Sequence, residues 1–199
     1  MPSVFSHAIA AVAIGSVAVG GPSRVALWTL GAMCAVAPDV DAISVFLGVP
    51  YRHMLGHRGL THSILFAAVL ASAVTAVVRR ASPASPSAPR LWVFFFVATA
   101  SHGFLDAMTN GGLGVAFFAP FSDERYFMPW RPILVSPISL HVFLGYRGLR
   151  VMWSELGWVW LPATLVFLAG LALRRATSCR GDRSWSRRCR STRFSATEA

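Results

Sequence analysis

The chain of 199 residues has no lysine, only three cysteines and few charged residues of any kind. Cys34, Cys179 and Cys189 lie far apart and form no CxxC pair, so the sequence indicates neither a disulfide framework nor a thiolate zinc site. No basic residue precedes the first apolar run, and a cleaved signal peptide is therefore not expected. Internal repeats are not evident.

Apolar residues dominate the composition of the chain. They make up 55% of the chain, charged residues only 13%, and the mean hydropathy is +0.56. These values are typical of an integral membrane protein and exceed those of an ordinary soluble domain. We expect an all-α, polytopic helical membrane protein, with about four to six membrane-associated helices around a polar metal site.

The net charge of +10 comes from eighteen arginines, eight of which lie between Arg174 and Arg193. A basic balance of this kind can indicate nucleic-acid binding. Here the arginines cluster behind the last apolar run, which favours a disordered cytosolic tail close to anionic lipid. We therefore divide the chain into a membrane-embedded domain, residues 1–175, and an Arg-rich tail, residues 176–199, and expect no nucleic-acid partner.

Apolar runs and their breakers predict the helices. The expected helical segments are residues 7–19 with Ser6 as N-cap, 24–37, a brief 43–49, 63–78, 91–107, a short 133–146 and 156–173. Of these, 63–78 and 91–107 are the clear membrane spans and 156–173 is a last span. Residues 81–90, rich in Ser, Pro and Ala, are expected to be a flexible linker. Residues 109–132 are expected to form an aromatic-rich loop at the bilayer interface.

Arginine placement predicts the orientation, since positively charged loops stay in the cytoplasm. Arg79, Arg80 and Arg90 place the 81–90 linker inside, so the helix ends that carry the polar residues after 57 and after 101 lie outside. If residues 20–24 are also an inside turn, the early polar residues share the outer side. Arg147 and Arg150 are exceptions, and they leave the number of crossings after Asp106 open.

Four polar islands interrupt the apolar chain. They are His7, Pro38-Asp39-Val40-Asp41, His57-Arg58-Gly59-Leu60-Thr61-His62, and Ser101-His102 through Asp106. Ionisable residues at membrane depth are costly and are functional candidates by default. The spacing of His102 and Asp106 puts both on one helix face, and Gly59 permits a bend that turns His57 and His62 to the same side.

We interpret the islands as one metal site at the outer face. Its predicted ligands are His7, Asp39, Asp41, His57, His62, His102 and Asp106. Imidazole and carboxylate ligands without thiolate suit zinc, manganese or iron, and seven ligands exceed what one ion needs, which is compatible with two ions. A bound ion would acidify water and polarise an ester or phosphoryl oxygen, and a carboxylate left outside the first shell would act as general base. The predicted catalytic residues are Asp41, Arg58 and Asp106.

Each island taken alone also has a structural interpretation. His7 alone is more often a capping or interfacial residue, the Asp39/Asp41 turn an ordinary helix end, and His102 with Asp106 a buried hydrogen-bonded pair. Arg58 is predicted either to clamp an anionic group such as phosphate or to anchor a lipid headgroup. His53 and His141 lack an acidic partner and are expected to be structural. The shared face favours the metal site.

These residues, in this order, resemble the YdjM-like family of bacterial inner-membrane proteins, which are described as LexA-regulated, membrane-bound metal-dependent hydrolases. The resemblance covers roughly residues 1 to 145 and includes His102-Gly103-Phe104-Leu105-Asp106 and Ala119-Pro120-Phe121-Ser122. It implies a multi-pass protein of the bacterial inner membrane. The order of an early His, an Asp, a His and a His-x-x-x-Asp is also distantly similar to zinc-dependent phospholipase C and related single-strand nucleases, whose later histidine ligands have no clear match here.

The leading hypothesis is thus a metal-dependent hydrolase of the membrane, acting at the outer face on a phosphoester or lipid-linked substrate. Membrane lipid is an expected partner, and no protein partner is identifiable. The alternative is a non-enzymatic integral membrane protein whose His and Asp islands hold helices together or carry ions. A third interpretation is a stress-response scaffold that recruits a partner through its arginine tail.

Overall fold

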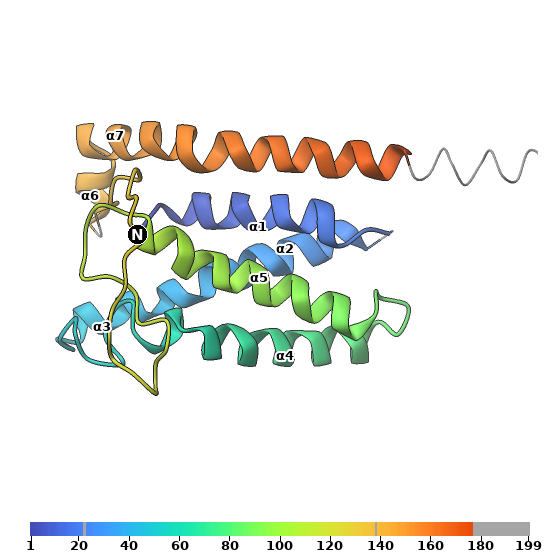
Figure 1. Cartoon of the computed structure of the whole chain (residues 1–199), viewed down its shortest axis with the longest axis horizontal. Helices are drawn as coiled ribbons and strands as arrows, with labels where there is room; N and C mark the ends of the chain where they lie inside the picture. The colour runs from blue at the N-terminus through green and yellow to red at the C-terminus, as the bar shows by residue number, and fades with distance from the viewer. Residues whose placement is uncertain (22, 138, 177–199) are drawn as a thin grey trace, which may run out of the picture.

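The computed structural model describes residues 1–21, 23–137 and 139–176 as a helical bundle (Figure 1). Its helices are α1 (Val4–Ala18), α2 (Arg24–Val36), η1 (Ala37–Ala42), α3 (Ile43–Phe46), η2 (Leu60–His62), α4 (Ile64–Ala81), α5 (Ala88–Ala107), α6 (Leu140–Phe143), α7 (Tyr146–Glu155) and η3 (Leu156–Trp160). Within the described residues, β structure is limited to two isolated bridges, Thr109 with Ile133 and Val115 with Tyr126. The all-helical prediction is confirmed.

Several helix boundaries differ from the prediction. Helix α1 begins at Val4, so Ser6 lies inside the helix and does not cap it. The last helix begins at Tyr146 and continues to Ala176, ten residues before the predicted start at 156. It contains the π-helical turn η3 just ahead of Pro162, which cannot donate an amide hydrogen bond inside a helix. Residues 177–199, and with them nearly all of the predicted tail, lie outside the described residues.

Within the part of the chain that the structure describes, three helical segments are long and apolar enough to cross a membrane: Arg24–Phe46, Ile64–Ala81 and Tyr146–Ala176. Helix α1 has only 15 residues. Helix α5, expected from sequence to span, is not among the three. It packs against α1, α2 and α4 and carries Arg90, His102 and Asp106. A helix surrounded by other helices does not need the apolarity of a lipid-facing one, so the predicted total of four to six membrane-associated helices stays a prediction.

The apolar core lies between α1, α2, α4 and α5. Its centre is Phe94 of α5, whose side chain is fully buried. Phe94 lies where α1 and α2 present Gly15 and Gly31, and a Cβ on Gly31 would overlap the Phe94 ring. Glycine at these two positions lets three helices approach closely, which fixes α5 against the ends of α1 and α2.

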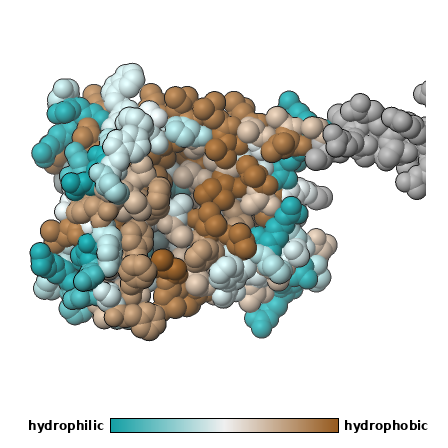
Figure 2. Space-filling view, in the orientation of Figure 1, coloured by the Kyte–Doolittle hydropathy of each residue, from teal (hydrophilic) through white to brown (hydrophobic). Residues whose placement is uncertain are grey.

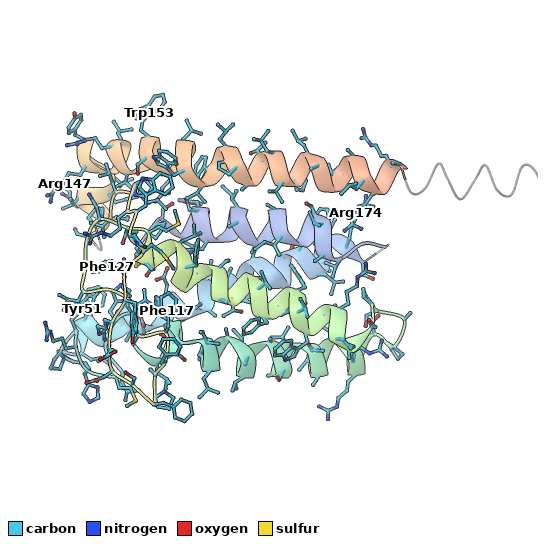
Figure 3. The ribbon with its side chains drawn as sticks, in the orientation of Figure 1. Tyr51, Phe117, Phe127, Arg147, Trp153 and Arg174 are labelled. Carbon is cyan, nitrogen blue, oxygen red and sulfur yellow. The ribbon has the colours of Figure 1, made fainter. Side chains whose placement is uncertain are left out.

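The two ends of the bundle differ in charge. Arginines begin α2 and α5 and end α4 and the last helix, and no acidic residue accompanies them in residues 19–24, 79–90 or 172–176. Figure 3 shows Arg174 at this end and Tyr51, Phe117, Phe127 and Arg147 at the other. Hydrophobic residues cover much of the face between the ends (Figure 2). The opposite end is formed by the long loops (Figure 1). It holds the joined residues Asp39, Asp41 and Asp106, the loop residues Asp123 and Glu124, and Glu155, which contacts Ser3.

Candidate metal centre

The four polar islands meet at the loop end of the bundle. His7 lies on the second turn of α1, Asp39 and Asp41 on η1, and His102 and Asp106 on the last turns of α5. The hexapeptide 57–62 folds into the connection before α4 and ends in η2. Contacts between side chains link all seven predicted ligands into one cluster.

A tight backbone turn positions the hexapeptide. Arg58 adopts a left-handed conformation, with φ of 63°. The Arg58 amide donates to Asp41 Oδ2 at 3.0 Å, and a Cβ on Gly59 would overlap the carbonyl of Met54. The predicted bend is therefore present, with Arg58 as the left-handed residue and Gly59 as the point of close approach. Ser63 then caps α4 by accepting from the Phe66 amide.

The hydrogen bonds of two histidines determine which ring nitrogen is left bare. His102 Nδ1 lies 2.7 Å from the carbonyl oxygen of Ala35, and His62 Nδ1 lies 3.0 Å from Asp41 Oδ2. Both Nδ1 atoms therefore carry the proton in the neutral rings, because their partners only accept. The two Nε2 atoms face each other at 3.0 Å. In neutral rings both Nε2 atoms would carry a lone pair and repel at this distance, so the geometry calls for a proton or a metal ion between them.

The neighbouring carboxylates complete a ligand set around these two nitrogens. Asp106 Oδ2 lies 3.3 Å from His62 Nε2 and 4.0 Å from His102 Nε2, while Asp39 Oδ1 lies 3.3 Å from His102 Nε2. Four ligands at about 2.0–2.1 Å from a zinc ion stand about 3.3–3.4 Å apart in a tetrahedron. The spacings among His62, His102 and Asp106, 3.0 to 4.0 Å, bracket that value. Asp39 approaches the same His102 nitrogen but does not share a triplet with His62 or Asp106.

Two triplets meet the geometric requirement for holding an ion, His62 with His102 and Asp106, and His7 with Asp39 and His102. In each triplet the ligand atoms lie within 4.8 Å of one another. Both ring nitrogens of His7, both carboxylate oxygens of Asp39 and Oδ1 of Asp106 are buried without a hydrogen-bond partner in the described part of the chain. Oδ2 of Asp106 faces Arg58 Nε at 2.9 Å and His62 Nε2 at 3.3 Å. Buried polar atoms nearly always have partners, and a metal ion would supply one here.

Asp41 and His57 occupy a different position. His57 Nδ1 lies 2.6 Å from Asp41 Oδ1, and the Thr61 hydroxyl donates to Asp41 Oδ2 at 2.5 Å. Neither residue belongs to the two triplets. Their contacts turn Asp41 toward the Nδ1 side of His62, away from the bare nitrogens, which is the arrangement of a carboxylate that orients a metal-binding imidazole.

Arg58 is buried, with 1% of its surface exposed, and its guanidinium faces inward. Nε lies 2.9 Å from Asp106 Oδ2, and the two terminal nitrogens donate to the Gly111 carbonyl and the Thr109 hydroxyl at 3.0 and 3.1 Å. These contacts favour a role in fixing Asp106 and the 109–111 loop. They leave little of the guanidinium for the anion or lipid headgroup predicted from sequence.

The electrostatics of the cluster favour a cation. Burial lowers the pKa of His62, but hydrogen bonds to Asp106 and Asp41 outweigh it and raise the pKa to about 9. A positive charge at this position is thus stabilised whether it is a proton or a metal ion. Histidines 53 and 141, predicted to be structural, are exposed and belong to neither triplet.

Two residues that support the cluster were not identified from sequence. The buried carboxylate of Glu155 accepts from the Ser3 amide at 2.5 Å and from the Ser6 hydroxyl at 2.6 Å, which fixes the first turn of α1 next to His7. Arg125 donates to the carbonyls of Tyr51 and His57 at 2.8 and 3.1 Å and holds the hexapeptide loop. A lone acid in an apolar segment was a readable signal for Glu155. The sequence gives no comparable signal for the role of Arg125.

The fold and the cluster define a helical membrane protein with a buried histidine and aspartate centre at one end. The chain belongs to the YdjM inner membrane protein family, which it matches over residues 1–177. It is similar to the inner membrane protein YbcI of Escherichia coli K12, with 41% identity over 169 residues, 83% of this chain and 95% of that protein. No solved structure matches it. Location in the bacterial inner membrane, expected from the resemblance, is confirmed.

Proposed function

We propose that the chain binds a divalent metal ion, zinc in the first instance, through His62, His102 and Asp106. The observation that carries the proposal is the pair of Nε2 atoms of His62 and His102, which face each other at 3.0 Å with the Asp106 carboxylate 3.3 Å from His62 Nε2. Nitrogen and oxygen ligands without thiolate are also compatible with manganese or iron. Zinc fits best because the spacings match a tetrahedron.

One ion, and not two, accounts for both triplets. They share His102, and an imidazole nitrogen has one lone pair, so His102 Nε2 serves a single ion while its Nδ1 is engaged by Ala35. Asp39 is the natural fourth ligand, since its Oδ1 lies 3.3 Å from His102 Nε2. His7 is stacked on the His102 ring, with 3.7 Å between the ring centroids. It either adds a further ligand to the ion or covers the site from the side of α1.

The remaining predicted residues act on the ligands. Asp41 and His57 hold the tautomer of His62, and Arg58 holds Asp106. A divalent ion held here supplies Lewis acidity and an acidified water, the chemistry of metal-dependent ester and phosphoester hydrolysis. Asp39, whose side chain is 7% exposed, is the ligand nearest to solvent. Where water takes the fourth position in its place, the freed Asp39 carboxylate would be placed to accept a proton from that water.

The site faces the outside of the inner membrane in this proposal. The end that carries Arg79, Arg80 and Arg90 in and around one short connection is taken as the cytoplasmic end, since positively charged short connections stay inside. The loop end, where six acids accompany the arginines, is then external, and the substrate is a phosphoester or a lipid-linked ester that reaches the outer leaflet.

Metal analysis and activity together test the proposal. Protein purified in detergent without chelator is measured for bound metal and assayed on phosphomonoester, phosphodiester and carboxylester substrates. Asp106→Asn keeps the shape of the ligand and removes its charge; Asp123→Asn is the matched control at an exposed acid. We expect metal and hydrolysis in the wild type and the control, and loss of both in Asp106→Asn. Equal metal content in all three refutes the site.

A structural metal or ion-carrying centre is the second candidate, and burial favours it. His7, His102 and Asp106 are fully buried and His62 is 4% exposed. Closed coordination is typical of structural zinc sites, whereas catalytic sites keep a position for water. In that case the metal is present, removal lowers the melting temperature, and none of the three substrate classes is hydrolysed.

A further inference from the structure

A second polar feature lies behind the loop that carries Thr109 and Gly111. It is a cavity of about 360 Å³ whose lining includes Asn110, Val135, Ser136, Arg147 and Arg150. Arg147 and Arg150 stand three apart on α7, so both guanidinium groups share one face of that helix. These are the two arginines that the positive-inside rule left unexplained. Figure 3 shows Arg147 at the loop end of the bundle.

The polar groups of the cavity are mainly hydrogen-bond donors. Within the described residues, no carboxylate forms an ion pair with Arg147 or Arg150. Asn110 Oδ1 accepts from the Val135 amide at 3.0 Å, which leaves the Nδ2 protons as the donors that Asn110 offers to a ligand. Two guanidinium groups and an amide donor suit a phosphate group.

The position of α7 indicates what carries the phosphate. Tyr146 and Trp153 are 75% and 73% exposed at the start of a 31-residue helix that is long and apolar enough to span the membrane. Such aromatic residues accumulate at the level of the lipid headgroups. Arg147 and Arg150 are interleaved with them, so their side chains lie at the depth of a lipid phosphate.

The cavity and the candidate metal centre share a wall. Asn110 lies between Thr109 and Gly111, and both of these accept hydrogen bonds from Arg58, whose Nε contacts Asp106. We propose that this cavity binds the phosphate of a lipid-borne substrate and holds it beside the metal centre. The proposal rests on the proposed function only in calling the ligand a substrate.

Binding to the full-length protein in detergent tests the inference. The probes are dioleoyl phosphatidylglycerol, dioleoylglycerol with the same chains and no phosphate, and inorganic phosphate. Arg147→Gln/Arg150→Gln removes both cations from the cavity. Arg80→Gln/Arg175→Gln removes two exposed arginines from the opposite end and is the matched control. Ser136→Glu, a second cavity variant, places a carboxylate opposite the ligand and keeps both arginines.

We expect both cavity variants to weaken phosphatidylglycerol binding at least about tenfold, since charge-assisted hydrogen bonds are lost or opposed. The control should bind phosphatidylglycerol as tightly as the wild type does. Dioleoylglycerol should bind the wild type and every variant much more weakly than phosphatidylglycerol binds the wild type. If inorganic phosphate competes with phosphatidylglycerol, the cavity recognises the phosphate group alone. If it does not compete, binding also requires the rest of the lipid. Unchanged phosphatidylglycerol affinity in both cavity variants, or equal binding of dioleoylglycerol, overturns the inference.

The same titration in EDTA separates this inference from the proposed function. Arginine-dependent binding that persists in protein without metal means that the cavity stands even if the metal centre fails. If the protein holds metal at His62, His102 and Asp106 but binds phosphatidylglycerol independently of Arg147 and Arg150, the metal centre stands and the inference about the cavity fails.

Discussion

Replacing His102 by alanine tests the ligand set most severely, because His102 belongs to both triplets. Zinc in four-ligand protein sites binds with an apparent free energy of about 10–16 kcal/mol, so one ligand of four contributes about 3 kcal/mol. At about 1.4 kcal/mol for each tenfold change, His102→Ala should weaken zinc binding by about 100-fold. Competition with a chromophoric chelator on detergent-solubilised protein measures this change.

His53→Ala is the control, because His53 is exposed and lies outside both triplets. Its zinc affinity should equal that of the wild type. Asp106→Asn guards against a packing artefact, since it preserves side-chain volume and should lose affinity to a similar degree. If His102→Ala and His53→Ala bind zinc equally well, the bare Nε2 atoms do not form a metal site and the reasoning fails.

Three further changes follow from the same contacts. Asp41 orients His62, so Asp41→Asn should lower zinc affinity by about 10–100-fold in the chelator assay although every metal ligand is intact. Glu124→Gln, at an acid outside the cluster, should leave the zinc affinity unchanged. Glu155→Gln weakens the bonds from Ser3 and Ser6 and should lower the free energy of unfolding by about 2–3 kcal/mol; an unchanged melting temperature would contradict the assigned role. Gly31→Ala should cost about 1–3 kcal/mol by overpacking Phe94, while Gly157→Ala, where a Cβ meets nothing within 4 Å, should be neutral.

The helical architecture was predictable because apolar runs, arginines and Gly-Pro breakers mark the helix ends. The start of the last helix was not, since Arg147 and Arg150 resemble the end of a span. The structure extends the helix through them because its first turns lie against the 134–137 segment. Helix α5 illustrates a second limit: a central helix need not be as apolar as the lipid-facing helices around it.

The grouping of the site residues was predictable from charge placement and helix spacing, but their roles were not. Spacing brings His57 and His62 to one side, yet only the three-dimensional contacts pair His57 with Asp41 and leave His62 Nε2 bare. Arg58 shows the same limit. Its place beside the ligands predicted either an anion clamp or a lipid-headgroup anchor, whereas its contacts with Asp106, Thr109 and Gly111 are formed by segments about fifty residues away.

X-ray absorption at the zinc edge on purified, zinc-loaded protein tests the central claim most directly. The account predicts a shell of nitrogen and oxygen ligands at about 2.0–2.1 Å with the outer-shell scattering of at least two imidazole rings, and loss of one imidazole in His102→Ala. Sulfur at about 2.3 Å, or an imidazole contribution that is the same in His102→Ala as in the wild type, would contradict it.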